Sequence, residues 1–373
     1  MIYLDNSATT PVNEKVLEVF NRVCLEYPGN SNSIHSLGVK SKNLEDYATK
    51  RIAKMLGVKP SEIIYTSGAS ESNNLAIKGI CNKFGNRGRH IITTMLEHSS
   101  ISEPLKYLAK NGYEIDYVKI KDDGLVDIDN LKSLLRDDTI LVSICAVDSE
   151  IGLMQPISEI GEIVKNYPKC YFHVDCTQAI GKVNIDFTNI DMASFSAHKF
   201  FGLKGIGVLV KKENIMIEPL IHGGKSSTIF RSGTPPLPLI VSLMKALELI
   251  TNNINSNYEH VIELNKIIID RLKQYKNIHI NSTNNSLCYI INFSIKGIKP
   301  ETLVHALEEY DIYISTKSAC SSSNTISDSV YALTKDRELS SESVRVSLSC
   351  LTTKEEIIRF LDVFDIVYNK LNL

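Results

Sequence analysis

Between about residue 60 and residue 210 the chain alternates short apolar runs with segments of helical periodicity. This alternation constrains the fold more than any other feature of the sequence. The runs expected to form strands are Ile63–Thr66, His90–Met95, Ile115–Ile120, Thr139–Ala146, Cys170–Val174, Met192–Phe195 and Gly207–Val210. Strands that alternate with helices predict a mainly parallel sheet covered on both faces. The expected fold class is therefore α/β.

The remainder of the chain predicts a second, smaller unit. A long helical region, Pro238–Tyr275, has an expected break at Asn252–Asn257. It is followed by two expected strands and two expected helices, namely Tyr289–Ile295, Val344–Leu348, Pro300–Tyr310 and Thr353–Leu371. Because 373 residues is long for a single core, we expect two domains. Residues 13–255 would form the large domain, and residues 1–12 with 256–373 a small α+β domain.

Polar side chains follow the ends of the predicted strands, where open parallel sheets bind their ligands. They are Ser67, His98, Ser149, Asp175, His198 and Lys199. Asp175 and Lys199 suit pyridoxal phosphate (PLP). The lysine would form a Schiff base with the aldehyde, and the carboxylate would pair with the pyridinium nitrogen. The alternative for this pair alone is two surface residues on loops.

The segment Thr66–Asn74 combines a glycine and several hydroxyls just where a helix is expected to begin. Free amides and the helix dipole make such a position an anion site that would suit the PLP phosphate. An ordinary capped helix is the alternative. The segments His222–Gly224 and Arg231–Thr234 form a second region of small residues suited to phosphate.

Two further residues have alternative interpretations. His98 at a strand end could stack on a cofactor ring or move protons, although a lone His usually does neither. Arg345 lies within an otherwise apolar strand and needs a partner. That partner would be either a substrate carboxylate bound by two hydrogen bonds or a structural acid.

Composition indicates a cytoplasmic protein with no membrane or nucleic-acid partner. The net charge is −2, and 43% of residues are hydrophobic. No apolar run approaches the roughly 20 residues that span a bilayer, and the N-terminus lacks a signal-peptide pattern. The eight Cys form no CxxC pair, which argues against a zinc or dithiol site. Cys320 lies in a loop of small and polar residues, where its thiol would be accessible to solvent.

Seven motifs, in this order and spacing, resemble the cysteine desulfurases, PLP enzymes of the class V aminotransferase type. They are LDNSATTP (4–11), YTSGASESNNLAIKG (65–79), EH (97–98), HVDCTQAIGK (173–182), SFSAHKFFGLKGIG (194–207), RSGT (231–234) and SACSS (318–322). The likeness runs nearly end to end and is to the NifS/IscS-like group. It implies the fold type I of PLP-dependent transferases, with a small domain that carries a mobile Cys loop. It also implies a homodimer that converts L-cysteine to L-alanine and passes the sulfur to an acceptor protein.

The resemblance also implies roles for matching positions. Lys199 would be the Schiff-base lysine and Cys320 the nucleophile that becomes a persulfide. Asp175 would hold the pyridine nitrogen, Gln178 the phenolic oxygen, and His98 would stack on the ring and assist proton transfer. The phosphate would be bound by Ala69, Ser70, Ser196 and His198, together with Thr234 of the second subunit. Arg345 would bind the substrate carboxylate. No metal site is expected, although Cys320 could contact an iron–sulfur cluster on a partner.

The chain departs from the family pattern on the substrate side. Asp148 and Ser149 replace two Asn, the second of which contacts cofactor and substrate, and Asp148 is expected to add negative charge near the substrate carboxylate. The other departures are Lys225–Ser227, Lys317 and Ser349–Cys350. They leave three functions open: a cysteine desulfurase, a selenocysteine lyase or other PLP β-elimination enzyme, and a low-activity sulfur-relay or binding partner. The acceptor would be an iron–sulfur scaffold or a tRNA-thiolation enzyme.

Overall fold

The computed structural model describes residues 1–224, 228–316 and 326–371. Its large sheet has seven strands in the order β2-β8-β7-β6-β5-β3-β4. They are β2 (Ile63–Thr66), β3 (His90–Thr93), β4 (Glu114–Tyr117), β5 (Thr139–Cys145), β6 (Tyr171–Asp175), β7 (Met192–Ser196) and β8 (Gly207–Lys211). Only β8 runs antiparallel to its neighbours in this sheet. The predicted α/β class and mainly parallel sheet are confirmed.

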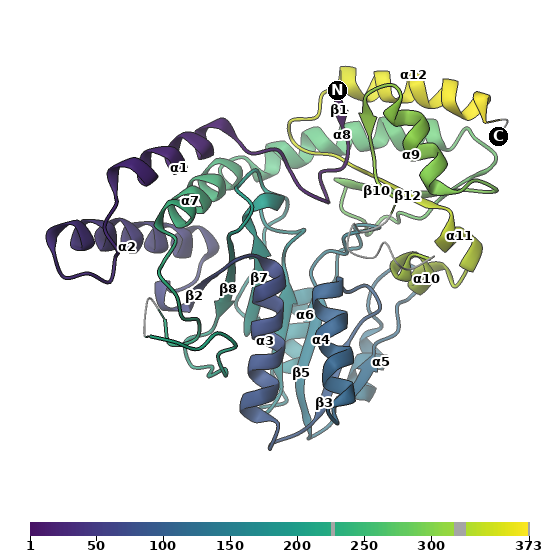
Figure 1. Cartoon of the computed structure of the whole chain (residues 1–373). Coiled ribbons are helices and arrows are strands. Elements are labelled where there is room, and N and C mark those ends of the chain that lie inside the picture. Colours follow the sequence, from purple (N-terminus) through teal and green to yellow (C-terminus); the bar gives the residue numbers. More distant parts are fainter. Residues whose placement is uncertain (225–227, 317–325, 372–373) are drawn as a thin grey trace.

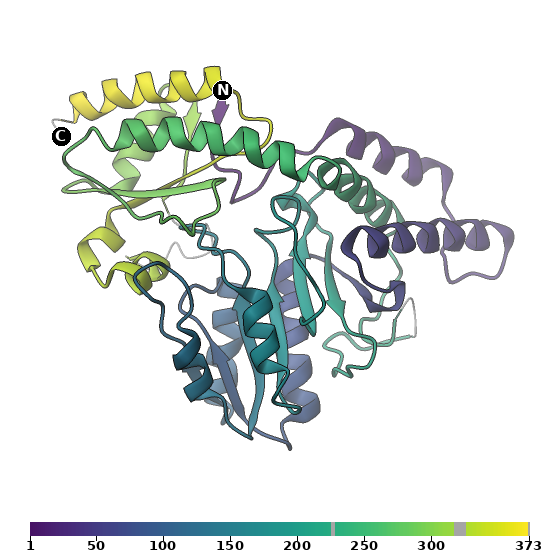
Figure 2. The same cartoon turned by 180° about the vertical axis from the view of Figure 1, so that it is seen from behind.

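Helices cover both faces of the sheet. On one face α3 (Ala69–Phe84) packs across the middle strands beside α4 (Ser99–Lys110), and on the other face α6 (Ile157–Val164) packs on β6 (Figures 1 and 2). The short helix α5 (Ile128–Leu134) connects β4 to β5. Near the β2–β8 edge α7 (Leu237–Thr251) packs against α1 (Glu14–Glu26) and α2 (Ser36–Leu56).

The predicted long helix is two helices, because the chain breaks between α7 and α8 (Ile254–Leu272), close to the expected position. No single helix among the described residues is long and apolar enough to cross a membrane. Only the α7–α8 pair, bent by 66°, meets that criterion jointly. Beyond α8 a second sheet has the order β12-β10-β9, formed by β9 (Ile278–Ile280), β10 (Ile290–Ile295) and β12 (Ser343–Ser347).

Both chain termini lie in this second part of the molecule, near opposite ends of its C-terminal helix (Figure 1). The N-terminal β1 (Ile2–Tyr3) pairs in parallel with β11 (Ile312–Tyr313). The helices here are α9 (Pro300–Glu308), α10 (Asp328–Thr334), α11 (Arg337–Ser341) and α12 (Lys354–Lys370). Thr353 caps α12 in a capping box with Glu356. The proposed domain boundaries themselves stay a prediction.

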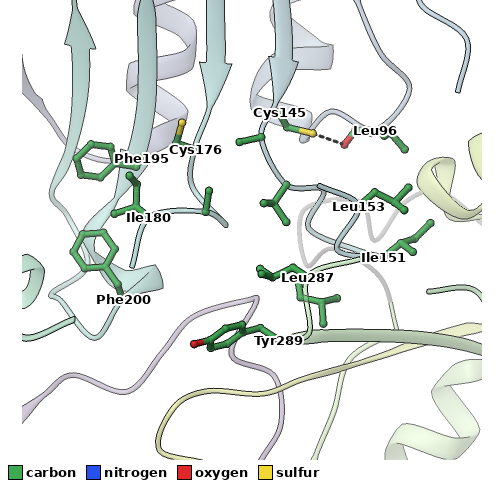
Figure 3. Packing of buried hydrophobic residues seen from close by; sticks show 14 of the residues in the cluster. Leu96, Cys145, Ile151, Leu153, Cys176, Ile180, Phe195, Phe200, Leu287 and Tyr289 are labelled. Carbon is green, nitrogen blue, oxygen red and sulfur yellow. Dashed lines mark hydrogen bonds between the residues drawn. The ribbon is translucent and has the colours of Figure 1, made fainter. Parts of the chain in front are cut away.

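The turn after β5 joins the two parts of the molecule. Ile151 and Leu153 in this turn belong to the same buried cluster as Leu287 and Tyr289, which precede β10 (Figure 3). The amide of Leu287 donates to the Gly152 carbonyl at 2.8 Å. Gly152 has φ +81°, and a Cβ there would lie 3.0 Å from Ile290 Cβ, so the close approach requires glycine. The turn after β5 is therefore held in place both by the large sheet that it leaves and by the segment that precedes β10.

Candidate active site

A cavity of about 410 Å³ opens where the parallel strands of the large sheet end. Its size falls within the range of small-molecule sites in proteins. Ten of the expected site residues line it, namely Ala69, Ser70, His98, Ser149, Asp175, Gln178, Ser196, His198, Lys199 and Arg345. Residues from distant segments of the chain thus converge on one cavity, as their positions after strand ends predict.

Asp175 ends β6 and presents a buried carboxylate to this cavity. One oxygen accepts the backbone amide of Thr177 at 2.9 Å, and the other accepts Asn73 Nδ2 at 2.8 Å. Asn73 lies on α3, whose face packs on the sheet, and its own Oδ1 is buried without a partner. Two donors therefore hold this carboxylate in one orientation, available to a cationic ring nitrogen.

Lys199 lies on the connection between the antiparallel neighbours β7 and β8. Its Nζ donates to the backbone carbonyls of Ser7 and Ala8, at 2.5 and 2.9 Å. The N-terminal segment is fixed to the same connection by Thr10, whose amide and hydroxyl both donate to the His198 carbonyl. The N-terminal residues thus form one wall of the cavity and hold the amine in place.

The beginning of α3 forms a cradle for an anion. The first amides of a helix have no intrahelical acceptor, and here the Ala69 amide donates to Ser196 Oγ at 2.7 Å. Gly68 and Gly207 let the two segments approach closely, since a Cβ on Gly207 would lie 2.6 Å from Gly68 Cα. Ser70 adds a hydroxyl at the same helix end. Amides, hydroxyls and the positive helix end suit a phosphate group.

Two histidines in the cavity have lowered proton affinity. Burial lowers the pKa of His98, the positive charge of Lys199 adds to this, and the carboxylate of Asp175 opposes it. Burial and neighbouring positive charges lower the pKa of His198 to about 4. His98 Nδ1 interacts with the hydroxyl and amide of Ser100, where it caps α4. Near neutral pH both rings are therefore uncharged and able to exchange protons.

Arg345 on β12 reaches the cavity from the second sheet and is 1% exposed. Its Nη2 pairs with Asp5 Oδ1 at 2.8 Å, and Nη1 donates to the Ser149 carbonyl at 2.9 Å. Its Nε is buried without a partner. Both interpretations of this arginine are thus supported, since it has a structural acid partner and also faces the cavity.

The structure corrects the expectation that Asp148 places its charge beside the substrate. Its carboxylate is absent from the cavity lining and accepts the amides of Glu150 and Ile151 and the hydroxyl of Ser329 on α10. Glu150 likewise accepts the hydroxyl of Ser327, which caps α10. We call these two contacts the α10 clasp. Burial, reinforced by the charge of Glu150, raises the pKa of Asp148 to about 6.

Several expected features lie elsewhere. Cys320, Lys317 and Lys225–Ser227 fall outside the described residues. Thr234 is exposed and does not line the cavity of its own chain. The described part of the chain contains no cluster of three or more His, Cys, Asp or Glu side chains suited to a metal.

Sequence reasoning missed some of the residues that build the site. Asn73 was inside a recognised motif, one helical turn after Ala69, and that spacing could have placed it on the face toward the sheet. The carbonyls of Ser7 and Ala8 and the carboxylate of Asp5 could not be found this way. The predicted small domain groups residues 1–12 with the unit that contains β12, but no sequence pattern indicates that this segment also contacts the connection between β7 and β8.

Comparison with known proteins agrees with this geometry. The profile of the family described as aminotransferase class-V matches residues 2–360. The chain belongs to the class-V aminotransferase family. Among these proteins it is 40% identical to the cysteine desulfurase IscS of Dictyoglomus turgidum, over 99% of this chain and 95% of that protein. It is also 40% identical to the cysteine desulfurase IscS of Methanosarcina thermophila, over 99% and 92%.

Solved structures place the chain among the NifS-like members of the class-V aminotransferases. A NifS-like protein superposes with a TM-score of 0.92 at 36% identity, covering 98% of this chain and 99% of that one. The protein SspA, solved in complex with cysteine, superposes with a TM-score of 0.83 at 34% identity, covering 95% and 100%. The resemblance read from the seven motifs is confirmed.

The class-V aminotransferases and cysteine desulfurases are PLP enzymes, and the cavity fits this cofactor. The anion cradle at α3, the carboxylate of Asp175 and the amine of Lys199 match its phosphate, ring nitrogen and aldehyde in chemical type. All three face a cavity with room for such a molecule.

Proposed function

We propose that this chain is a PLP-dependent cysteine desulfurase. L-cysteine and the thiol of Cys320 would give L-alanine and a persulfide on Cys320. The C–S bond of the substrate breaks, an S–S bond forms, and the thiol proton balances the new C–H bond of alanine. The persulfide would then pass its terminal sulfur to an acceptor protein. The cysteine desulfurases among its relatives, and SspA in complex with cysteine, support this proposal.

When bound, PLP supplies an electron sink for charge that develops on the substrate Cα. The chain's own part is to hold the ring and move protons. Asp175 would keep the ring nitrogen protonated, Gln178 would donate to the phenolic oxygen, and His98 would stack on the ring. Lys199 would hold the cofactor and take the proton from the substrate Cα. Because His98 is uncharged near neutral pH, it can assist that transfer.

Substrate binding would depend on Arg345 and Ser149. The guanidinium faces the cavity with an unpaired Nε, and carboxylates pair with such forks through two hydrogen bonds. Burial makes this interaction stronger than it would be in water. Asp5 keeps the guanidinium oriented, and Ser149 lines the same part of the cavity, where its hydroxyl is proposed to contact substrate and cofactor oxygen.

The phosphate would be held by Ala69, Ser70, Ser196 and His198, with Thr234 supplied by the second subunit of a homodimer. A dimer is supported by apolar side chains exposed on the two projecting helices α1 and α2 (Figure 1), namely Leu17, Leu25, Leu37, Val39 and Tyr47. Sedimentation analysis tests the dimer. A Thr234→Ala variant that binds PLP as tightly as the wild type would contradict the cross-subunit contact.

The single observation that carries the proposal is that Asp175 and Lys199 line one cavity with the anion cradle of α3. The test is to incubate purified protein with L-cysteine, PLP and a reductant and to measure alanine and sulfide. We expect alanine release by the wild type and by Cys24→Ala, which removes an exposed thiol elsewhere. We expect none from Cys320→Ala, and mass spectrometry should find one added sulfur on Cys320 of the wild type.

The same assay separates the other two functions. Turnover of selenocysteine without turnover of cysteine would favour a selenocysteine lyase. PLP absorbance without alanine release, even with reductant, would favour a sulfur-relay or binding partner. The proposed acceptor is an iron–sulfur scaffold or a tRNA-thiolation enzyme, and transfer of labelled sulfur from the persulfide to each candidate distinguishes them.

A further inference from the structure

Four polar side chains form a hydrogen-bond network at the wall of the cavity. Asn73 Nδ2 donates to Asp175 Oδ2 at 2.8 Å and to Ser100 Oγ at 2.9 Å. Ser100 Oγ in turn lies 2.8 Å from Nδ1 of His98. Asp175, Ser100 and His98 line the cavity, and Asn73 is fully buried. The network therefore connects the carboxylate proposed for the ring nitrogen to the histidine proposed to stack on the same ring.

The direction of the hydrogen bonds in this network is fixed from the Asp175 end. Both oxygens of that carboxylate accept from nitrogen donors, the Thr177 amide and Asn73 Nδ2. A flipped Asn73 amide would set its oxygen against a carboxylate oxygen, and neither atom could donate. The Asn73 nitrogen therefore faces Asp175 and Ser100, although its Oδ1 is then buried without a partner. Burying an unsatisfied oxygen costs stability, so the two hydrogen bonds of the nitrogen must outweigh that cost.

The backbone decides which nitrogen of His98 carries the proton. The Ser100 amide donates to His98 Nδ1 at 3.1 Å, where this side chain caps α4. A backbone N–H can only donate, so Nδ1 must present its lone pair. Because Ser100 Oγ already accepts from Asn73, its own hydrogen is available to donate to the same lone pair. The neutral ring then carries its proton on Nε2, which has no hydrogen-bond partner among the described residues.

We propose that Asn73 and Ser100 are positioning residues for His98: they fix its neutral ring in the tautomer protonated on Nε2, so that the ring presents a hydrogen-bond donor, and not a base, to the cavity. This rests on the proposed cofactor site, against which the ring would stack. The basic nitrogen of His98 is engaged by Ser100 and is not available to take a proton. Lys199 is then the group that accepts the substrate proton, and His98 assists by donating to negative charge that develops beside it.

Capping a helix with histidine does not require such a network. His35 caps α2 by accepting the Gly38 amide on its Nδ1 at 3.2 Å, and its side chain is exposed. Within the described part of the chain no side chain donates to it. The Ser100 hydroxyl and the buried Asn73 are therefore additions beyond what a cap needs. His35 also serves as an internal control for the experiment below.

The test reads the protonation of each ring nitrogen by NMR. Full-length protein with ¹⁵N-labelled histidine is studied at pH 8, both with PLP and after its removal. Burial lowers the pKa of His98, so the ring is neutral at this pH. The His98 signals are those that a His98→Gln variant lacks. We expect a protonated Nε2 and an unprotonated, hydrogen-bonded Nδ1, and a proton on Nδ1 would overturn the proposal.

Variants then test the two positioning residues. Ser100→Ala removes the hydroxyl and keeps the amide, so its His98 Nδ1 signal should move toward that of a nitrogen without hydrogen bonds. The ratio of the Nε2-protonated to the Nδ1-protonated ring should fall by up to roughly tenfold. Ser100→Thr keeps the hydroxyl and should restore both values. Asn73→Ala should displace the same Nδ1 signal although Ser100 is intact, and the His35 signals should stay unchanged throughout.

A His98 Nδ1 signal that is the same in Ser100→Ala as in the wild type would refute the proposal, as would a displacement that Ser100→Thr does not reverse. Purely structural roles for Asn73 and Ser100 would change the thermal midpoint of unfolding and leave the His98 signals in place. Should Asn73→Ala fail to fold, Ser100→Ala, at a partly exposed position, still decides the question. No measurement needs cysteine turnover, so failure of the desulfurase proposal and failure of this one are distinguishable.

Discussion

Replacing Asp148 by Asn should stabilise the protein at high pH. The structure places this carboxylate in the α10 clasp, where burial raises its pKa from 3.8 to about 6. An acid with a raised pKa binds its proton more tightly in the folded state than in the unfolded chain. The charged carboxylate therefore lowers the free energy of unfolding. This loss of stability has its full size above about pH 6 and becomes smaller as the pH falls toward 4.

The shift is about two pH units, each equivalent to about 1.4 kcal/mol, so the cost at pH 8 is about 3 kcal/mol at most. An Asn keeps the contacts, because its oxygen can accept the amides of Glu150 and Ile151 while its nitrogen donates to Ser329. The free energy of unfolding of Asp148→Asn should therefore exceed that of the wild type by up to this amount at pH 8. At pH 5 the difference should be about half as large.

The assay is thermal unfolding of wild type and variant at pH 5, 6, 7 and 8, followed by circular dichroism. Asp122→Asn, at an exposed acid, is the control and should change stability by less than about 0.5 kcal/mol. If Asp148→Asn gives no gain at pH 8, or an equal gain at every pH, the charge of Asp148 is not buried in the way described.

Three further outcomes are expected. Asp175→Asn removes the proposed charged partner of the ring nitrogen and should weaken PLP affinity roughly 10- to 100-fold by spectroscopic titration; unchanged affinity would contradict its role. Ser196→Ala should weaken binding of PLP roughly fivefold but not that of pyridoxal, and equal effects on both would exclude a phosphate contact. Burial raises the pKa of Glu97 to about 8, so the charge of Glu97 should cost progressively more stability as the pH rises from 5 to 8, and the stability gained by Glu97→Gln over the wild type should grow across that range; a gain that does not change with pH would contradict this.

Much of the fold can be predicted from the local pattern of apolar and polar residues in the sequence. Each predicted strand of the large sheet has a counterpart within a few residues, because a buried parallel strand is a short apolar run bounded by polar residues. The break between α7 and α8 was visible as an asparagine-rich interruption. The very short strands β1 and β11 were missed, since two residues carry no periodicity.

The site residues could be predicted from the sequence where a reactive side chain lies at or just after the end of a strand. Asp175 ends β6 and Lys199 lies shortly after β7, and these strands are adjacent and parallel, so the proximity of the two residues follows from topology. Asp148 was misjudged because a strand end does not determine which way the next side chain turns. The partner that decides its direction is Ser329, whose distance along the chain hides the contact from sequence.

The antiparallel strand β8 has a consequence for how the site assembles. It pairs with β7 through a short connection, but it also separates β7 from β2, with Ile63 opposite Val210. A nascent chain that ends before Val210 therefore lacks the neighbour against which β2 and the first turn of α3 must dock. The anion cradle at the start of α3 can form only after the ribosome has synthesised β8, so this early part of the site waits for a strand that is made much later.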